Sequence, residues 1–225
     1  MRRPHILVIN PNSNTAVTAA IDAAVNPFRF ADGPEIACTT LEEGPLGVET
    51  QKDADSVTMP LRRLVKGAND VVAFVLACYS DPGLHVCREG TSSPVFGIGE
   101  CAIATALTRG DRFGVIAIGA RSIARHLRSL RQTGSIGRLA GERSLDMSVA
   151  ETASGDRTLA LMIEVGRMLV QQDGADVVVM GCAGMARHRA ALQQALGIPV
   201  IDPIQAAISM AIGAVQTAAA FADGA

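Results

Sequence analysis

Short runs of apolar residues alternate along the chain with longer segments in which apolar residues recur every three or four positions. The short runs are rich in β-branched residues and bounded by turn residues, which predicts strands, and the longer segments predict helices. The predicted strands are 6–9, 35–39, 71–77, 95–96, 113–118, 177–180 and 200–201. The predicted helices are 14–25, 54–66, 99–107, 122–132, 157–172, 185–196 and 203–221. The segment 134–148 has no clean period and is expected to be a loop or an irregular strand.

Two of the predicted strands, 71–77 and 177–180, are continuously apolar. Such runs are typical of parallel strands that helices cover on both faces. Repeated alternation of strand and helix therefore predicts an α/β fold with parallel sheets.

The strand–turn–helix pattern also occurs twice. The segment 6–13 resembles 115–122, and the segment 70–78 resembles 176–182. An internal repeat of this size indicates two structural units of one plan. We expect two pseudo-symmetric lobes, each a parallel Rossmann- or flavodoxin-like sheet flanked by helices, with an active-site cleft between them. The predicted lobes are 1–98 plus 204–225 and 99–203.

Composition limits the possible partners and location. A chain of 225 residues with 48% hydrophobic residues can bury a sizeable core, which excludes disorder. With 20 Lys+Arg against 22 Asp+Glu, it lacks the positive charge that nucleic-acid binding requires. No apolar run is long enough for a signal peptide or a membrane span, so we expect a cytoplasmic protein without membrane partners. Five scattered cysteines argue against a disulfide framework. The alanine-rich helix 204–221 favours a homo-oligomer, which would be a dimer or a larger assembly.

Two cysteines occupy matching places in the repeat. Cys78 and Cys182 each follow a buried strand, where ligands bind in parallel α/β sheets. One such cysteine is most simply a small hydrophobic residue, but two at matching positions favour chemistry. A helix N-terminus would lower the pKa of each thiol, and the backbone N–H groups that follow can hold a carboxylate or enolate oxygen. Two acid–base groups flanking one carbon can remove a proton from one face and return it to the other, which is racemisation without a cofactor.

Three motifs carry a family resemblance. They are Ile9-Asn10-Pro11-Asn12-Ser13, Ala77-Cys78-Tyr79-Ser80-Asp81-Pro82-Gly83-Leu84 and Gly181-Cys182-Ala183-Gly184-Met185. Through them the chain resembles the aspartate/glutamate/hydantoin racemase family, nearest its hydantoin and allantoin racemase branch. The resemblance implies a cofactor-independent racemase in which Cys78 and Cys182 are the opposed bases. It also implies that Asn10 and the backbone after each cysteine anchor a small-molecule substrate, such as a 5-substituted hydantoin or a similar imide. The residues expected to contact substrate are Asn10, Ser13, Tyr79, Ser80, Gly119, Ser122, Ala183 and Gly184.

The chain departs from the amino-acid racemases that it resembles. Those enzymes follow the first cysteine with Asn-Thr and the second with Thr-His, where this chain has Tyr79-Ser80 and Ala183-Gly184. The loss of polar side chains argues against free aspartate or glutamate as substrate and favours a pocket with little side-chain charge. Hydantoin-type members carry two threonines where this chain has Ala117-Ile118, followed by Gly119, so the particular imide stays open.

Three alternative functions stay open beside racemisation. Arylmalonate decarboxylases resemble this fold and need only the second cysteine, so the presence of Cys78 disfavours that reaction. Maleate-type cis–trans isomerases also resemble it and keep both cysteines, one of them as a nucleophile. A two-lobed small-molecule binding protein without catalysis is the third alternative, and thiol reactivity distinguishes it from an enzyme.

Two further patterns suggest cofactor or metal sites but have simpler explanations. Gly97–Ala102 fits a G-x-G-x-x-A dinucleotide fingerprint, yet the nearest acidic residue, Asp111, precedes the next strand instead of ending it. We interpret the motif as a turn into a helix and expect no cofactor. His85 and Cys87 lack a second pair to complete a tetrahedral metal site, so we expect no metal.

Several polar residues are expected to have ordinary structural roles. His126 and His188 stand beside arginines on predicted amphipathic helices and should be solvated, as should the arginine-rich face of 121–131. Ser13 and Ser122 precede helical segments and are natural N-caps.

Overall fold

Two parallel four-stranded sheets form the framework of the computed structural model, which describes residues 3–154 and 157–222. The first sheet has the order β2-β1-β3-β4 and the second has the equivalent order β6-β5-β7-β8. The strands are β1 (His5–Asn10), β2 (Glu35–Thr40), β3 (Val71–Leu76), β4 (Val95–Gly97), β5 (Phe113–Ala117), β6 (Leu139–Ser144), β7 (Val177–Met180) and β8 (Val200–Ile201). The predicted α/β fold with two lobes of one plan is therefore confirmed.

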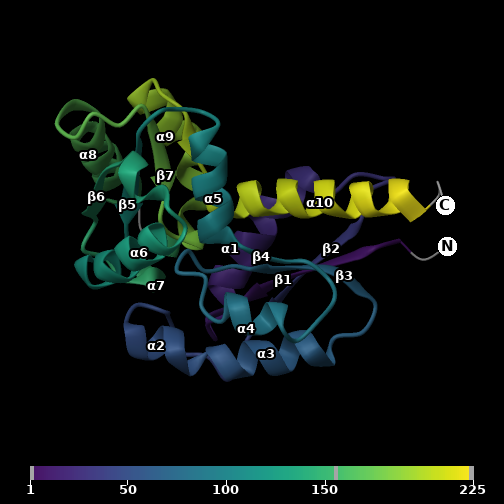
Figure 1. The fold of residues 1–225 in the computed structure, drawn as a ribbon. Helices are drawn as coiled ribbons and strands as arrows, with labels where there is room; N and C mark the ends of the chain where they lie inside the picture. The colour runs from purple at the N-terminus through teal and green to yellow at the C-terminus, as the bar shows by residue number, and fades with distance from the viewer. Residues whose placement is uncertain (1–2, 155–156, 223–225) are drawn as a thin grey trace.

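Helices flank both sheets (Figure 1). The α-helices are α1 (Thr15–Val25), α2 (Gln51–Ser56), α3 (Thr58–Gly67), α4 (Leu84–Arg88), α5 (Ile98–Leu107), α6 (Ala120–Gln132), α7 (Val149–Ser154), α8 (Arg157–Gln171), α9 (Arg189–Leu196) and α10 (Pro203–Ala222). Three short 3-10 helices are η1 (Asn26–Phe28), η2 (Ser135–Arg138) and η3 (Ala183–His188). In Figure 1, α1 and α10 lie on one side of the first sheet and α2 to α4 lie on the other. No helix within the described ranges is long and apolar enough to cross a membrane.

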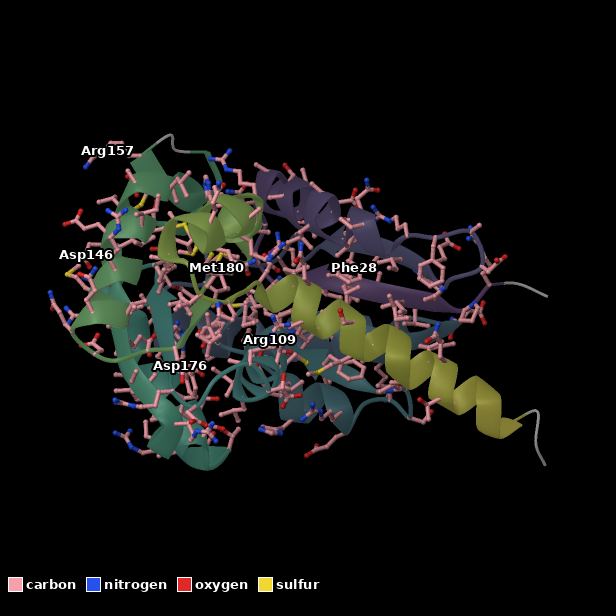
Figure 2. All side chains as sticks on the ribbon, turned by 90° about the horizontal axis from the view of Figure 1, so that it is seen from above. Phe28, Arg109, Asp146, Arg157, Asp176 and Met180 are labelled. Atoms are coloured by element: carbon pink, nitrogen blue, oxygen red, sulfur yellow. The ribbon has the colours of Figure 1, made fainter. Side chains whose placement is uncertain are left out.

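The chain passes between the lobes twice. It leaves the first sheet after β4 through α5, and it returns after β8 through α10, which packs against α5, α1 and β3. Figure 2 shows α10 running past Phe28, with Met180 inside the second lobe and Asp146 and Arg157 at its outer edge. One contiguous set of buried side chains extends from Ile6 in the first sheet through Val115 in the second, so the lobes share a core. The exact division of the chain into lobes stays a prediction.

Three predicted elements differ from the structure. The segment 134–148 contains β6, an edge strand whose residues are all half-buried, so its sequence has neither an apolar run nor a clean alternation. The predicted helix 54–66 is two helices, α2 and α3, which are separated at Val57. Thr50 forms a capping box with Asp53, which starts α2 three residues earlier than predicted. The predicted helix 185–196 begins as the 3-10 helix η3.

Candidate active site

One small cavity lies where β3 and β7, inner strands of the two sheets, end. Cys78 follows β3 and Cys182 follows β7, so the two lobes each contribute one thiol to the cavity. The cavity volume is about 30 Å³, close to that of one water molecule. The lining residues are Asn12, Val17, Val48, Ala77, Cys78, Tyr79, Ser80, Ile118, Ser122, Arg125, His126, Val149, Gly181, Cys182 and Ala183.

The structure brings together some of the predicted site residues and not others. Those that line the cavity are Cys78, Tyr79, Ser80, Ser122, Cys182 and Ala183. Those outside its lining are Asn10, Ser13, Gly119 and Gly184. Gly119 lines a separate, neighbouring cavity with Ser122. The substrate contacts assigned to these residues stay predictions.

Asn10 supports the wall of the cavity from behind. Its side-chain amide donates to Asn12 Oδ1 at 3.0 Å, to the Asn14 carbonyl at 3.2 Å and to Thr18 Oγ1 at 3.0 Å. The Asn12 backbone N–H donates to Asn10 Oδ1 in return, which fixes the side chain of Asn12 at the cavity. Asn12, two residues along the same motif, was missed by the sequence reasoning. Its Oδ1 accepts from Asn10 and from the Asn14 N–H, whereas its amide nitrogen donates to none of the described residues and can donate to a ligand.

The N-caps also differ from expectation. Asn14, rather than Ser13, caps α1, because its side chain accepts a hydrogen bond from the Ala16 N–H. Ser122 lies in the first turn of α6, and its hydroxyl donates to the Gly119 carbonyl at 2.8 Å. This hydrogen bond fixes the orientation of the hydroxyl group.

The expected lowering of the thiol pKa by a helix N-terminus does not hold for Cys78. The next helix, α4, begins only at Leu84, and Cys78 is followed by a turn in which the Asp81 N–H donates to the Cys78 carbonyl. Burial raises the pKa of Cys78 to about 12, although the Ser80 backbone N–H donates to its sulfur and opposes that rise. A negative charge on Cys182 raises the pKa of Cys78 further, so the two thiols resist ionising together.

A buried polar chain adjoins Cys78. Arg125 Nε donates to Ser80 Oγ at 2.9 Å, and Ser80 Oγ lies 3.1 Å from His126 Nε2. His126 Nδ1 lies 2.5 Å from Glu142 Oε1, and Tyr79 packs edge-on against the imidazole at a centroid separation of 4.9 Å. Because the Glu142 carboxylate can only accept, His126 Nδ1 carries the hydrogen and donates to it, and in the neutral ring Nε2 is then the acceptor for the Ser80 hydroxyl.

The prediction that His126 is solvated is therefore wrong. Only 5% of His126 and 8% of Arg125 is exposed. The buried stripe of α6 consists of Ser122, Arg125, His126 and Leu130, which face the first lobe. The buried face of α6 is mostly polar, so its sequence pattern is the same as that of a solvent-exposed charged face. Periodicity alone therefore predicts exposure for residues that are buried. The only sequence signal was the spacing of Arg125 and His126, three and four residues after Ser122.

The glycine-rich segment after β4 is a turn into α5, as expected. The Asp81 carboxylate accepts from Gly99 N at 2.8 Å and from Glu100 N at 2.7 Å, and it thereby occupies the N–H groups that a phosphate would need. A Cβ on Gly99 would stand 2.1 Å from the Tyr79 carbonyl oxygen, so glycine is required by close packing of backbone. Within the described residues no group of three His, Cys, Asp or Glu is placed to hold a metal ion.

Two parallel α/β lobes with a cysteine at the end of an inner strand in each form a fold shared with a solved racemase, and the chain is an isomerase of the racemase class. Comparison with known families agrees with this class, since residues 6–211 match the Asp/Glu/Hydantoin racemase family. The chain belongs to that family.

Two sets of similar proteins support the assignment. The chain is 36% identical over 211 residues to a hydantoin racemase of Paenarthrobacter aurescens, covering 92% of this chain and 89% of that one. It is 34% identical to a hydantoin racemase of Rhizobium meliloti, covering 92% and 87%. Among solved structures, an allantoin racemase from Klebsiella pneumoniae superposes with a TM-score of 0.89 at 29% identity, covering 95% of this chain and 88% of that one. Arylmalonate decarboxylase, at 21% identity and a TM-score of 0.64, shares the fold.

Proposed function

We propose that the protein racemises a 5-substituted hydantoin, or a similar small imide, by proton transfer between two cysteines. The observation that carries the proposal is the single cavity lined by Cys78 from one lobe and Cys182 from the other. The similarity to hydantoin racemases supports an imide ring as the substrate class.

One cysteine acts as thiolate and the other as thiol. The thiolate removes the proton from C5 of the ring, the electron pair spreads onto the adjacent carbonyl, and the thiol on the opposite face delivers its proton to C5. The two cysteines have then exchanged protonation states, and no proton is gained or lost overall. Mutual repulsion disfavours ionisation of both cysteines together, so no more than one of the pair is a thiolate at a time.

The polar groups on the cavity wall suit the planar ring. The Asn12 amide nitrogen is available as a donor, and Ser80 and Ser122 place hydroxyl groups on the same lining. The Asp81 and Met185 N–H groups are already used within the turns that follow the cysteines, so they contribute nothing to an enolate oxygen. Enolate stabilisation therefore falls to Asn12 and to the amides immediately after each cysteine.

Segments of both lobes border the cavity, whose small volume of about 30 Å³ limits how deeply a ring can enter. Val48 of the first lobe and Val149 of the second both line it, and Val149 N donates to Glu49 Oε1 at 2.9 Å. Separation of these two segments would open the cavity between the lobes.

The two cysteine variants test the proposal. Cys78→Ser and Cys182→Ser should each lower racemisation of a single-enantiomer hydantoin by about 10²-fold or more, since one acid–base group is lost. Polarimetry measures racemisation, and proton NMR in deuterated water measures C5 exchange, which one of the two variants should retain for one enantiomer. Cys38→Ser is the matched control, because Cys38 is half-buried and lies outside the cavity lining. Racemisation that persists in both active-site variants would exclude the two-base mechanism.

The same assay separates the alternative functions. The substrate panel holds 5-substituted hydantoins and allantoin, with maleate, an arylmalonate, aspartate and glutamate as comparisons. Turnover of maleate or of the malonate without exchange on any hydantoin would assign an isomerase or a decarboxylase instead. Binding without any turnover would assign a binding protein.

A further inference from the structure

Arg125 is a buried cation with unused donors. Its Nε donates to Ser80, and among residues 3–154 and 157–222 no other hydrogen bond and no ion pair involves its guanidinium. The acidic groups that act on its charge without a hydrogen bond are Cys78 first, and then Asp53 and Asp55 on α2. Arg125 is only 8% exposed as a residue and has no hydrogen-bonded carboxylate partner among the described residues, and burial of such a cation is costly unless an anion compensates its charge.

The guanidinium is held in place by the chain that ends at Glu142. Ser80 accepts from Arg125, His126 accepts from Ser80, and Glu142 accepts from His126. The side chain of Glu142 is only 1% exposed. Because each group is fixed by the next, the plane and position of the guanidinium are defined before any ligand binds, as bidentate recognition of a carboxylate requires.

Arg125 lines three neighbouring cavities, one of which, about 350 Å³, is also lined by Asp55 and Arg128. It lines the cavity that holds both thiols, and its charge acts directly on the Cys78 thiol. It also lines an adjoining cavity of about 170 Å³, which shares Tyr79, Ser80 and His126 with the first. This adjoining cavity is larger than the first, so it offers space for a substituent when the reacting carbon lies between the two thiols.

We propose that Arg125 binds an anionic group on the 5-substituent of the substrate, so that the enzyme prefers hydantoins with an acidic side chain. This inference rests on the proposed function. We assign the partner of Arg125 to the substituent and not to the ring, because a neutral imide ring cannot compensate the buried positive charge, whereas a carboxylate on the substituent can. It also reverses the expectation of a pocket with little side-chain charge.

A matched pair of substrates tests the charge alone. The 5-(2-carboxyethyl) and 5-(2-carbamoylethyl) hydantoins differ by a carboxylate against an amide of the same shape. The wild-type enzyme should racemise the acid with a kcat/KM about 10- to 100-fold higher than the amide, mainly through a lower KM. Arg125→Gln should lower kcat/KM for the acid more than for the amide, mainly by raising KM for the acid, so that the ratio between the two substrates falls toward one.

Two further variants guard against a purely structural effect. Arg128→Gln removes an exposed arginine one turn away that donates to Gln51, and it should keep the preference for the acid. Arg125→Lys retains the positive charge, so it should keep part of the preference for the acid. This variant tests the role of the charge independently of whether Arg125→Gln folds.

The outcomes are distinct. Equal loss of kcat on both substrates in Arg125→Gln would place Arg125 on the ring and overturn the proposal. Equal kcat/KM for the two substrates in the wild-type enzyme would also overturn it while leaving the racemase function intact. Failure of the wild-type enzyme to racemise any hydantoin would overturn the proposed function, and this inference with it.

Discussion

At the scale of single residues, burial governs the chemistry of Cys78. A thiol whose pKa is raised to about 12 is protonated near neutral pH, so it is ready to act as the acid. Once ionised, it is a stronger base toward a C–H bond than a thiolate of low pKa would be. The same desolvation therefore makes the thiolate rarer and more reactive.

This leads to a prediction about ionisation. The ultraviolet absorbance of thiolate at Cys78 should stay at no more than a few per cent of its full value up to about pH 10, since a group with pKa about 12 is only about one-hundredth ionised there. The measurement is the absorbance difference between Cys182→Ser and the Cys78→Ser/Cys182→Ser double variant. A plateau below about pH 8 would show that the surroundings lower the pKa after all.

The site residues differ in how far sequence alone could find them. Cys78 and Cys182 were identifiable because an internal repeat places them at equivalent strand ends. Arg125 and His126 were not, because their burial depends on the first lobe covering α6, and no local pattern encodes the packing of two distant segments. Glu142 lies on the edge strand β6, which itself has no clear sequence period.

At the scale of elements, buried strands were the most predictable feature. The strands β7 and β8 have the predicted bounds, because continuous burial on both faces leaves an uninterrupted apolar run. Helix starts were less predictable, because capping depends on side-chain hydrogen bonds. The helix α10 begins directly after Asp202, whose Oδ1 accepts from Gln205 N at 2.9 Å.

The Asp202 cap carries a prediction about pH and stability. Burial raises the pKa of Asp202 to about 6, and its Oδ2 has no partner among the described residues. A carboxyl whose pKa is higher in the folded state stabilises the fold below its unfolded pKa, and that contribution is lost as pH rises through about 6. Asp202→Asn keeps the capping oxygen without the buried charge, so it should raise the free energy of unfolding at pH 8 by about 1–3 kcal/mol.

Thermal melts of Asp202→Asn and wild type at about pH 5 and pH 8 measure this difference. The advantage of the variant should shrink at the lower pH, where the wild-type carboxyl is protonated. An advantage of the same size at both values would show that the carboxyl does not titrate in this range.

At the scale of the whole molecule, a shared core joins the two lobes. The buried set that contains Ile6 and Val115 also contains Ile204 and Ile208 of α10, so α10 ties the end of the second lobe to the first. A core that crosses between the lobes makes independent unfolding of either one costly.

We expect one cooperative unfolding transition, and a core substitution in α10 should shift it as a whole. Ile208 is fully buried, so Ile208→Ala should cost about 2–4 kcal/mol and lower Tm without splitting the transition. Calorimetry measures both quantities. Ser209→Ala, an exposed neighbour, is the control and should change stability by less than about 0.5 kcal/mol. Two resolved transitions in the variant or the wild type would contradict a shared core.

The two walls of the cavity are unequal, since Arg125 and His126 stand beside Cys78 and the walls are not mirror images. Mirror-image molecules have the same free energy in water, so the equilibrium constant between two hydantoin enantiomers is one. The Haldane relation then requires kcat/KM to be equal for the two directions, whatever the asymmetry of the protein. The unequal walls can therefore change kcat and KM between the two enantiomers only by the same factor. The enantiomer with the lower KM then has the lower kcat. Any substitution at Arg125 must likewise change kcat/KM by the same factor for both hands of a given substrate.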